Sequence, residues 1–248
     1  MINFFRRLRE KLVAENRFSK YLIYAFGEII LVVIGILIAL QINTWNEERK
    51  DKAIGDQYLA DIRQDLENDL DQMKGIMTAI SYEISVITSI DSSLYKMHAP
   101  NSHEGSKLFA NPYELTPDTM HITSIFYRNR SFRPADGTYT SLIADGKSGL
   151  IKNRDLLLKI QSIYDGENKR LASTYESIKA KEEKVNWTYP YEIKKWTYTD
   201  LKKAKDEKIF YDAMRLVEEK LFYVGNLIRT KEKIIEVTDL INKELADD

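Results

Sequence analysis

Cysteine is absent from the 248-residue chain, and glycine and proline are scarce, with 10 and 5 residues. Without cysteine the chain can form no disulfide, no cysteine-bound zinc or iron–sulfur centre and no thiol nucleophile. Glycine and proline together reach about half of their usual share of roughly 12%, while charged residues make up 30% of the chain. Few helix breakers in a highly charged chain indicate long helices rather than a turn-rich sandwich or barrel.

An excess of charge of one sign is also missing, since 37 basic residues face 38 acidic ones. Nucleic-acid-binding proteins usually carry a basic excess, so we expect no nucleic-acid partner. The sequence contains no Ser/His/Asp arrangement, zinc-ligand spacing or dinucleotide fingerprint. We therefore expect no catalytic, cofactor-binding or metal-binding residues, and a protein that is not an enzyme. The tripeptide from Gly146 to Ser148 resembles the end of a P-loop, but Ser141 stands where that motif requires glycine.

One long hydrophobic run lies near the N-terminus. Residues 21–45 contain no lysine or arginine, and Glu28 is their one formally charged residue. As a helix they span roughly 37 Å, more than the ~30 Å hydrocarbon core of a bilayer. Tyr21, Tyr24 and Trp45 stand near the ends, where aromatic rings favour the headgroup region. The run predicts a transmembrane helix over 21–45; a buried core helix and a cleaved signal peptide are the alternatives.

The flanks of this run predict its orientation. Residues 1–20 contain six basic and two acidic residues, whereas the 20 residues after Trp45 contain four basic ones and are net acidic. The positive-inside rule places the N-terminus in the cytoplasm and residues 46–248 in the periplasm of a Gram-negative cell, with the helix in the inner membrane. Residues 1–20 form a basic amphipathic segment that either lies on anionic lipid or serves only as the positive flank.

The first 50 residues resemble a known family. They read K-Y-L-x-Y-A-x-G-E-I over Lys20 to Ile29, G-I-L-I-A-L-Q-I-N over Gly35 to Asn43, and W-N-E over Trp45 to Glu47. This pattern is similar to the N-terminal signature of a family of uncharacterised single-pass membrane proteins of Gram-negative bacteria, and a weaker similarity runs over 132–165. The family is a domain of unknown function, so the resemblance implies a topology and no activity.

Helical periodicity continues beyond the hydrophobic run. One apolar line is formed by Leu70, Met73, Met77, Ile80, Ile84 and Ile87, and a second by Ile62, Ile76 and Ile90. Two adjacent lines make a face that is too wide for a two-stranded coiled coil and predict a helix packed against two neighbours. We expect this stem helix to reach about Lys96. The acidic residues Asp65, Glu67, Asp69 and Asp71 are interpreted as its solvated face.

The remaining chain predicts further helices around this stem. A short helix is expected near Met120, and another between Asp136-Gly137 and Gly146. Asn153 is a predicted cap for a long helix whose inner face is Leu157, Ile160, Tyr164, Leu171, Tyr175 and Ile178. A last helix from about Asp206 buries Phe210, Met214, Val217, Leu221, Val224 and Ile228, and later Ile234, Val237, Ile241 and Leu245. The predicted fold is all-α: one N-terminal transmembrane helix continuing into an extramembrane antiparallel helical bundle (46–248) with a long coiled-coil-like stem helix.

Two groups of residues are candidate sites. Within the run, Glu28 is either a proton-responsive carboxylate in an oligomer or a group that bonds a neighbouring helix or the headgroups. Helix association is expected from small and polar residues of the run: Gly27, Gly35, Ala39, Gln41 and Asn43. Segment 186–200 is rich in aromatics that either bind a sugar or protein partner or pack on the end of the bundle: Trp187, Tyr189, Tyr191, Trp196 and Tyr198.

These observations predict a non-enzymatic inner-membrane scaffold, adaptor or accessory subunit of a cell-envelope complex. Its expected partners are membrane lipids and other membrane or envelope subunits, including a second copy, through the transmembrane and stem helices. One alternative is a stator-like subunit that uses Glu28 for proton coupling. Another is a periplasmic ligand sensor that acts through a partner. The histidines His98, His103 and His121 are too scattered to predict a metal site.

Overall fold

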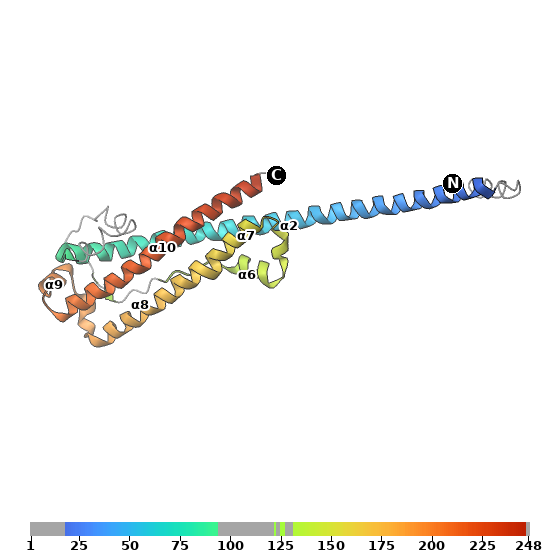
Figure 1. Cartoon of the computed structure of the whole chain (residues 1–248). Helices are drawn as coiled ribbons and strands as arrows, with labels where there is room; N and C mark the ends of the chain where they lie inside the picture. Colours follow the sequence, from blue (N-terminus) through green and yellow to red (C-terminus); the bar gives the residue numbers. More distant parts are fainter. Residues whose placement is uncertain (1–17, 94–121, 123–124, 127–130, 247–248) are drawn as a thin grey trace. The chain divides into compact units, whose positions relative to one another are not determined.

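The computed structural model describes residues 18–93, 122, 125–126 and 131–246 of the chain (Figure 1). The regular secondary structure of these residues is helical, with no strand among them. The chain divides into two compact units, Met1–Gly55 (unit 1) and Asp56–Asp248 (unit 2). The predicted amphipathic segment and most of the predicted helix near Met120 lie outside the described residues.

The longest element is α2, Phe18–Ile90, an unbroken helix of 73 residues. No proline occurs before Pro100, so nothing in this stretch removes a backbone donor. The last turns carry Ser and Thr side chains that bond back to the helix carbonyls, as Ser85 does to Ser81 at 2.9 Å, and such bonds weaken a helix. The helix ends where the Asp91 carboxylate accepts the backbone N–H of Ser93 at 2.8 Å. The stem therefore stops slightly before the predicted position.

The core of unit 2 begins on α2 with Leu59. Most residues of both predicted apolar lines are buried: Ile62, Met73, Ile76, Ile80, Ile84 and Ile87. Leu70, Met77 and Ile90 are half-buried against the same core. The line through Ile62 and Ile76 would face water in a two-stranded coil, so its burial agrees with a helix that packs on two sides. Ile122, Ile125 and Phe126 are also buried in this core.

The partners of α2 in the core are α8, Asn168–Thr188, and α10, Lys208–Ala246. Figure 1 shows α8 and α10 side by side, and Lys233 pairs with Glu167 while Lys181 pairs with Glu219, so these helices are antiparallel. Arg63 bonds Asn242 and Glu83 pairs with Lys220, so α10 is antiparallel to α2 as well. The predicted antiparallel arrangement thus describes α10 against each neighbour, whereas α2 and α8 run in the same direction because a long return lies between them.

Short helices form the part of that return from Gly137 to Gln161. They are α6, Gly137–Ala144, the 3₁₀ turn η2, Lys147–Leu150, and α7, Arg154–Gln161. The Asn153 side chain accepts the backbone N–H of Leu156 at 3.1 Å, which confirms the predicted cap. A π-helical turn, η3, Ser162–Glu167, joins α7 to α8. This turn was not predicted. In α7 before it, Leu156 is buried, whereas Leu157 of the predicted inner face is half-buried against the core.

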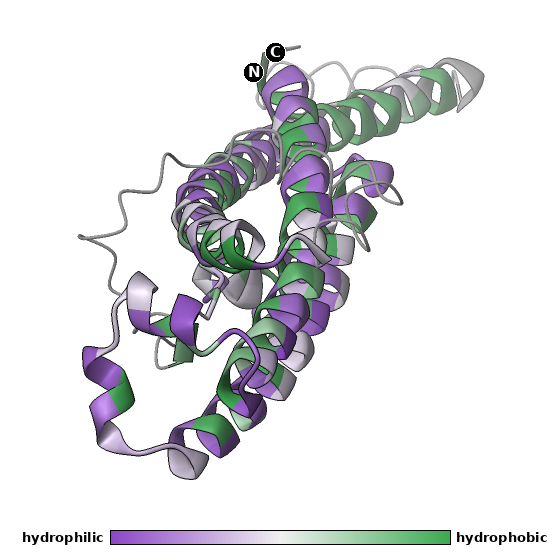
Figure 2. Cartoon of the chain, turned by 90° about the vertical axis from the view of Figure 1, so that its left-hand side faces the viewer, coloured by the Kyte–Doolittle hydropathy of each residue, from purple (hydrophilic) through white to green (hydrophobic). Residues whose placement is uncertain are grey.

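The α8–α10 connection contains η4, Tyr191–Lys195, and α9, Tyr198–Lys203. The Thr197 side chain and the Asp200 carboxylate form a capping box at the start of α9. In Figure 2 green and purple alternate along α8 and α10, as expected for helices with one apolar face. The buried residues of α10 include Phe210, Val217, Leu221, Val224, Ile234, Val237 and Ile241, as the pattern predicted.

Candidate functional site

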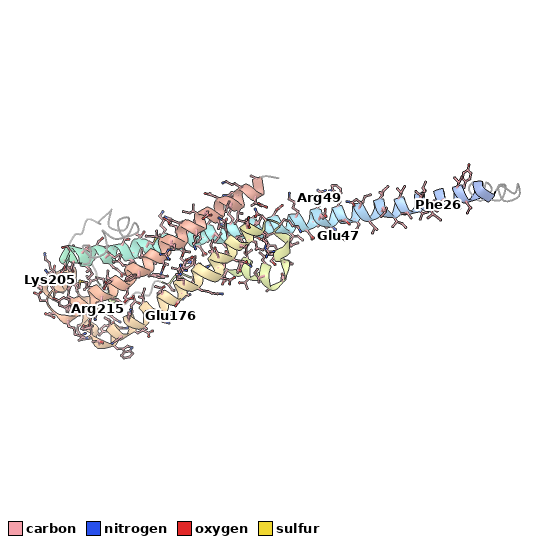
Figure 3. The ribbon with its side chains drawn as sticks, in the orientation of Figure 1. Phe26, Glu47, Arg49, Glu176, Lys205 and Arg215 are labelled. Carbon is pink, nitrogen blue, oxygen red and sulfur yellow. The ribbon has the colours of Figure 1, made fainter. Side chains whose placement is uncertain are left out.

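The apolar part of α2 is the largest unburied apolar surface among the described residues. An 18-residue window of this helix has a mean hydropathy of 2.6, and 0% of it is buried. Large side chains from Leu22 to Trp45 are exposed, and Figure 3 shows Phe26 pointing away from the helix. A core helix of a soluble domain would bury one of its faces, and a contiguous exposed apolar surface marks a site of interaction with a membrane or partner. The helix is therefore one candidate membrane span.

The predicted association residues lie along this exposed segment. A side chain added at Gly27 or Gly35 would meet no atom within 4 Å, so neither glycine is required by packing among the described residues. Asn43 donates to Glu47 at 3.0 Å, four residues further along the same helix. Glu28 and Gln41 are exposed on the helix surface. Their roles in association or proton coupling stay predictions.

The aromatic segment 186–200 is divided between core and surface. Tyr198 is buried and its hydroxyl contacts Ser89 Oγ at 3.0 Å, so this tyrosine fixes the segment to the end of α2. Tyr189 is half-buried and donates to Asp212. Trp187 is 90% exposed and Tyr191 is 68% exposed. Tyr198 therefore packs against the core, while Trp187 and Tyr191 face solvent. Partner binding by these aromatics stays a prediction.

A buried ionic triad joins the three long helices. Lys220 Nζ of α10 lies 2.8 Å from Glu83 Oε2 of α2 and 3.0 Å from Glu182 Oε1 of α8. The same ammonium donates to the Ile125 carbonyl at 3.1 Å. Each of the three side chains is at most 9% exposed. Burial raises the pKa of Glu182, and the neighbouring Lys220 opposes that rise.

The positions of the three charged residues in the sequence indicate this triad. Glu83 lies between Ile80 and Ile84 on the apolar face of α2, and Lys220 lies beside Leu221 on that of α10. Glu182 continues the inward stripe of α8 one turn beyond Ile178. Charged residues at apolar positions on separate helices are candidates for a buried pair, because lone buried charges are unfavourable.

A second polar cluster clamps an extended strap, residues 132–136, against α2 and α10. The Gln72 side chain accepts the N–H of Arg133 at 2.6 Å and donates to its carbonyl at 2.9 Å, as a neighbouring β-strand would. The Tyr223 hydroxyl accepts the N–H of Phe132 at 2.9 Å. The strap thus satisfies its backbone with side chains and positions α6, which follows it.

Asp69 of α2 also bonds the strap, so its predicted position on the solvated face of α2 is wrong. The residue is 1% exposed, and its Oδ1 accepts the N–H of Ala135 at 2.9 Å. Burial raises the pKa of Asp69 to about 6, the Ala135 N–H opposes the rise, and the charges of Asp65 and Asp136 add to it. Its Oδ2 has no hydrogen-bond partner within the described part of the chain. Asp69 lies seven residues from both Ile62 and Ile76, on the second apolar line, so its position predicts burial and only its charge suggested a solvated place. The strap supplies the backbone N–H that its buried carboxylate accepts.

Further buried polar groups lie around the π-helical turn η3. The Tyr139 and Tyr164 rings stack with centroids 4.4 Å apart, and Tyr139 donates to Asp165. The Tyr164 hydroxyl and both amide atoms of Asn168 are buried without a hydrogen-bond partner among the residues described. Burial raises the pKa of the Tyr164 hydroxyl, and Asp69 adds to the rise. π-Turns often accompany functional positions, but this cluster has the geometry of a packing centre: stacked rings and a clamped loop.

None of the described residues forms a group of three or more His, Asp or Glu side chains that could hold a metal ion. The three histidines of the sequence lie outside the described residues.

Comparison with known proteins gives one match. The model of the family of unknown function DUF6090 matches residues 28–190, which include most of the apolar segment, the stem, the strap and α8. No curated protein and no solved structure matches the chain. The match covers more than half of the sequence. The chain therefore belongs to the family of unknown function DUF6090.

Proposed function

We propose that this protein is a non-enzymatic, single-pass scaffold, adaptor or accessory subunit of a cell-envelope complex, held in the inner membrane by residues 21–45. The observation that carries the proposal is the complete exposure of an apolar helical window with a mean hydropathy of 2.6. Exposed apolar surface on this scale is unfavourable in water and favourable in a bilayer. The six basic residues within 1–20 support a cytoplasmic N-terminus, with unit 2 as a helical bundle in the periplasm.

The apolar segment, rather than the stem, is the proposed contact with a second copy or another subunit. From Leu59 onward the apolar face of α2 is occupied by the core of its own chain. Small residues at Gly35 and Ala39 let helix backbones approach closely, and both lie in the exposed segment.

Topology is tested by introduced cysteines, because the native chain contains none that would react. Ser19→Cys and Thr199→Cys are placed before the span and on α9. In intact spheroplasts a membrane-impermeant maleimide is expected to label Thr199→Cys, and to label Ser19→Cys only after lysis. Labelling of both sites, or of Ser19→Cys alone, contradicts the orientation. Loss of the chain from carbonate-washed membranes contradicts the anchor.

Association is tested with a matched pair of cysteines. Ala39→Cys lies on the small-residue face, and Leu37→Cys lies two residues away, about 200° around the helix. Oxidation in native membranes is expected to crosslink Ala39→Cys, to a second copy or to another subunit, and to leave Leu37→Cys uncrosslinked. Equal crosslinking at both positions, or none at either, contradicts association through this face.

A further inference from the structure

The connection between α8 and α10 forms one end of unit 2, and we call residues 184–208 the basic tip. The contact of Tyr198 with Ser89 places the tip beside the last turn of α2. Buried Ile193, Leu201 and Ala204 fix it to the core. The capping box of Thr197 and Asp200 sets the start of α9. The tip is therefore a surface with a defined backbone.

Charge is unevenly distributed along unit 2. The basic tip contains seven lysines and four acidic residues, whereas residues 56–71, at the other end of the stem within unit 2, contain six acidic residues and one arginine. Five tip lysines are exposed and have no ion pair within the described residues: Lys184, Lys195, Lys202, Lys203 and Lys205. Figure 3 shows Lys205 at this end. In a chain of net charge −1, the tip is thus a local anion-attracting surface.

Exposed aromatic rings accompany these lysines. Trp187 is 90% exposed and Tyr191 is 68% exposed, although tryptophan is among the most buried residue types on average. Lys194 Nζ lies 4.6 Å from the centroid of the Tyr191 ring. Figure 2, which looks at this end of unit 2, shows mainly hydrophilic colours over its short helices. Exposed aromatic rings that carry a polar group, together with neighbouring lysines, are typical of surfaces that bind at a membrane interface.

The exposed rings of Trp187 and Tyr191 indicate which class of anion the basic tip binds. Lysines alone would attract any polyanion, since long-range charge does not select a partner. An indole that is almost completely exposed gains most where its apolar body leaves water, as it does between lipid headgroups. We propose that the basic tip binds the headgroup region of an anionic bilayer, as a second membrane contact separate from the apolar part of α2.

Binding is measured with the full chain incorporated into phosphatidylcholine nanodiscs. These are mixed with phosphatidylcholine vesicles that contain or lack phosphatidylglycerol, and the vesicles are sedimented. We expect sedimentation only with phosphatidylglycerol and its loss in high salt, because salt screens the lysines. Brominated lipid in the vesicles should quench tryptophan fluorescence, and Trp187→Phe should abolish most of that quenching. Equal binding to both vesicles, or quenching unchanged in Trp187→Phe, would overturn the proposal.

Charge variants localise the surface. Lys195→Gln with Lys203→Gln is expected to weaken binding about fivefold for each lysine lost. The matched control, Lys152→Gln with Lys243→Gln, removes the same charge from the other end of unit 2, where Asn153 bonds Glu244 at 2.7 Å. We expect no change in the control. An equal loss in both pairs would show a general charge effect and overturn the proposal, as would preferential binding of a soluble polyanion such as heparin.

Failure of the anchor is distinguishable from failure of the tip. If the chain does not enter nanodiscs, the proposed span is wrong, and the free chain is tested with the same vesicles. If the chain enters nanodiscs but does not bind anionic vesicles, only the proposal for the basic tip is wrong. All substituted side chains are at the surface, so circular dichroism of each variant should match that of the parent chain.

Discussion

The carboxyl groups of Asp69 and Glu182 are buried, and burial raises the pKa of each, so we expect the stability of unit 2 to depend on pH. Asp69 bonds the strap through one oxygen, and Glu182 shares Lys220 with Glu83. The two sites differ in what protonation does. At Asp69 a proton relieves an unfavourable buried charge, whereas at Glu182 it weakens an ion pair that joins helices.

Asp69→Asn should flatten the pH dependence of stability. The folded-state pKa of about 6 lies above the ordinary value of 3.8, so the folded chain binds the proton more tightly than the unfolded chain. Its contribution is therefore favourable at low pH and is lost as the pH rises through about 6. The amide keeps an acceptor for Ala135 and does not titrate, so the loss of about 1–3 kcal/mol expected of the parent as the pH rises through about 6 should be absent from the variant.

Urea unfolding of the full chain in detergent, followed by circular dichroism at several pH values, checks this prediction. Asp71→Asn is the matched control, since Asp71 is exposed on the same helix and should change stability little at any pH. A variant whose stability falls as steeply as that of the parent between pH 4 and pH 7 would contradict the assigned pKa shift.

Lys220→Met should be strongly destabilising, because it leaves Glu83 and Glu182 buried together without the ammonium between them. Breaking a buried pair in this way costs about 3–5 kcal/mol. Lys181→Met is the control, because Lys181 and Glu219 form an exposed pair worth about 0–1 kcal/mol. Similar losses of unfolding free energy in the two variants would show that the triad does not stabilise the packing of the three helices.

At the scale of elements, the boundaries follow from local chemistry, and the π-helical turn does not. Asn153 and Thr197 begin their helices with side-chain caps, and Gly146 lies beyond the end of α6 in a left-handed conformation with φ of 67°. By contrast, no residue pattern within Ser162–Glu167 predicts the π-helical turn. Ile160, Ile163 and Tyr164 are buried along this segment, and the 3–4 spacing of a regular helix would give the same burial, so the apolar pattern does not reveal the turn.

Gly146→Ala should destabilise unit 2 although the site has room for a methyl group. No atom lies within 4 Å of the added Cβ, so the cost comes from the positive φ and should be about 1–2 kcal/mol. Gly149→Ala has equal room without a positive φ and should be neutral or stabilising by up to about 1 kcal/mol. Thermal unfolding of the two variants compares them directly, and equal shifts would contradict this explanation.

At the scale of the whole molecule, the two units have opposite surface chemistry. Unit 1 exposes its apolar residues on every side of α2, whereas unit 2 gathers its apolar residues in one core under a charged surface. We propose that a surface of each unit contacts a membrane: the apolar segment of unit 1 as the anchor and the basic tip of unit 2 as a lipid-binding site. The apolar segment would enter the hydrocarbon, and the tip would reach only the headgroups.

Charge placed in the apolar segment should reduce membrane retention. Aspartate near the centre of a span costs about 3 kcal/mol per residue, so Ile34→Asp with Leu37→Asp opposes insertion by about 6 kcal/mol. The control is Ile54→Asp with Leu158→Asp, two exposed positions outside the proposed span. The fraction of chain that pellets with carbonate-washed membranes should fall only in the first pair. Retention of both variants to the same extent would argue against residues 21–45 as the anchor.

The sequence by itself determined the helical class, the course of α2 and the faces of α2 and α10, because periodicity and the absence of proline act locally along one helix. It also contained the Asn153 cap, which depends on neighbouring residues alone. Only the tertiary structure decided that Asp69 bonds Ala135 and that Glu83, Glu182 and Lys220 meet. These contacts join residues separated by 38 to 137 positions, and periodicity along one helix does not identify the partner that a buried charged group meets on another segment.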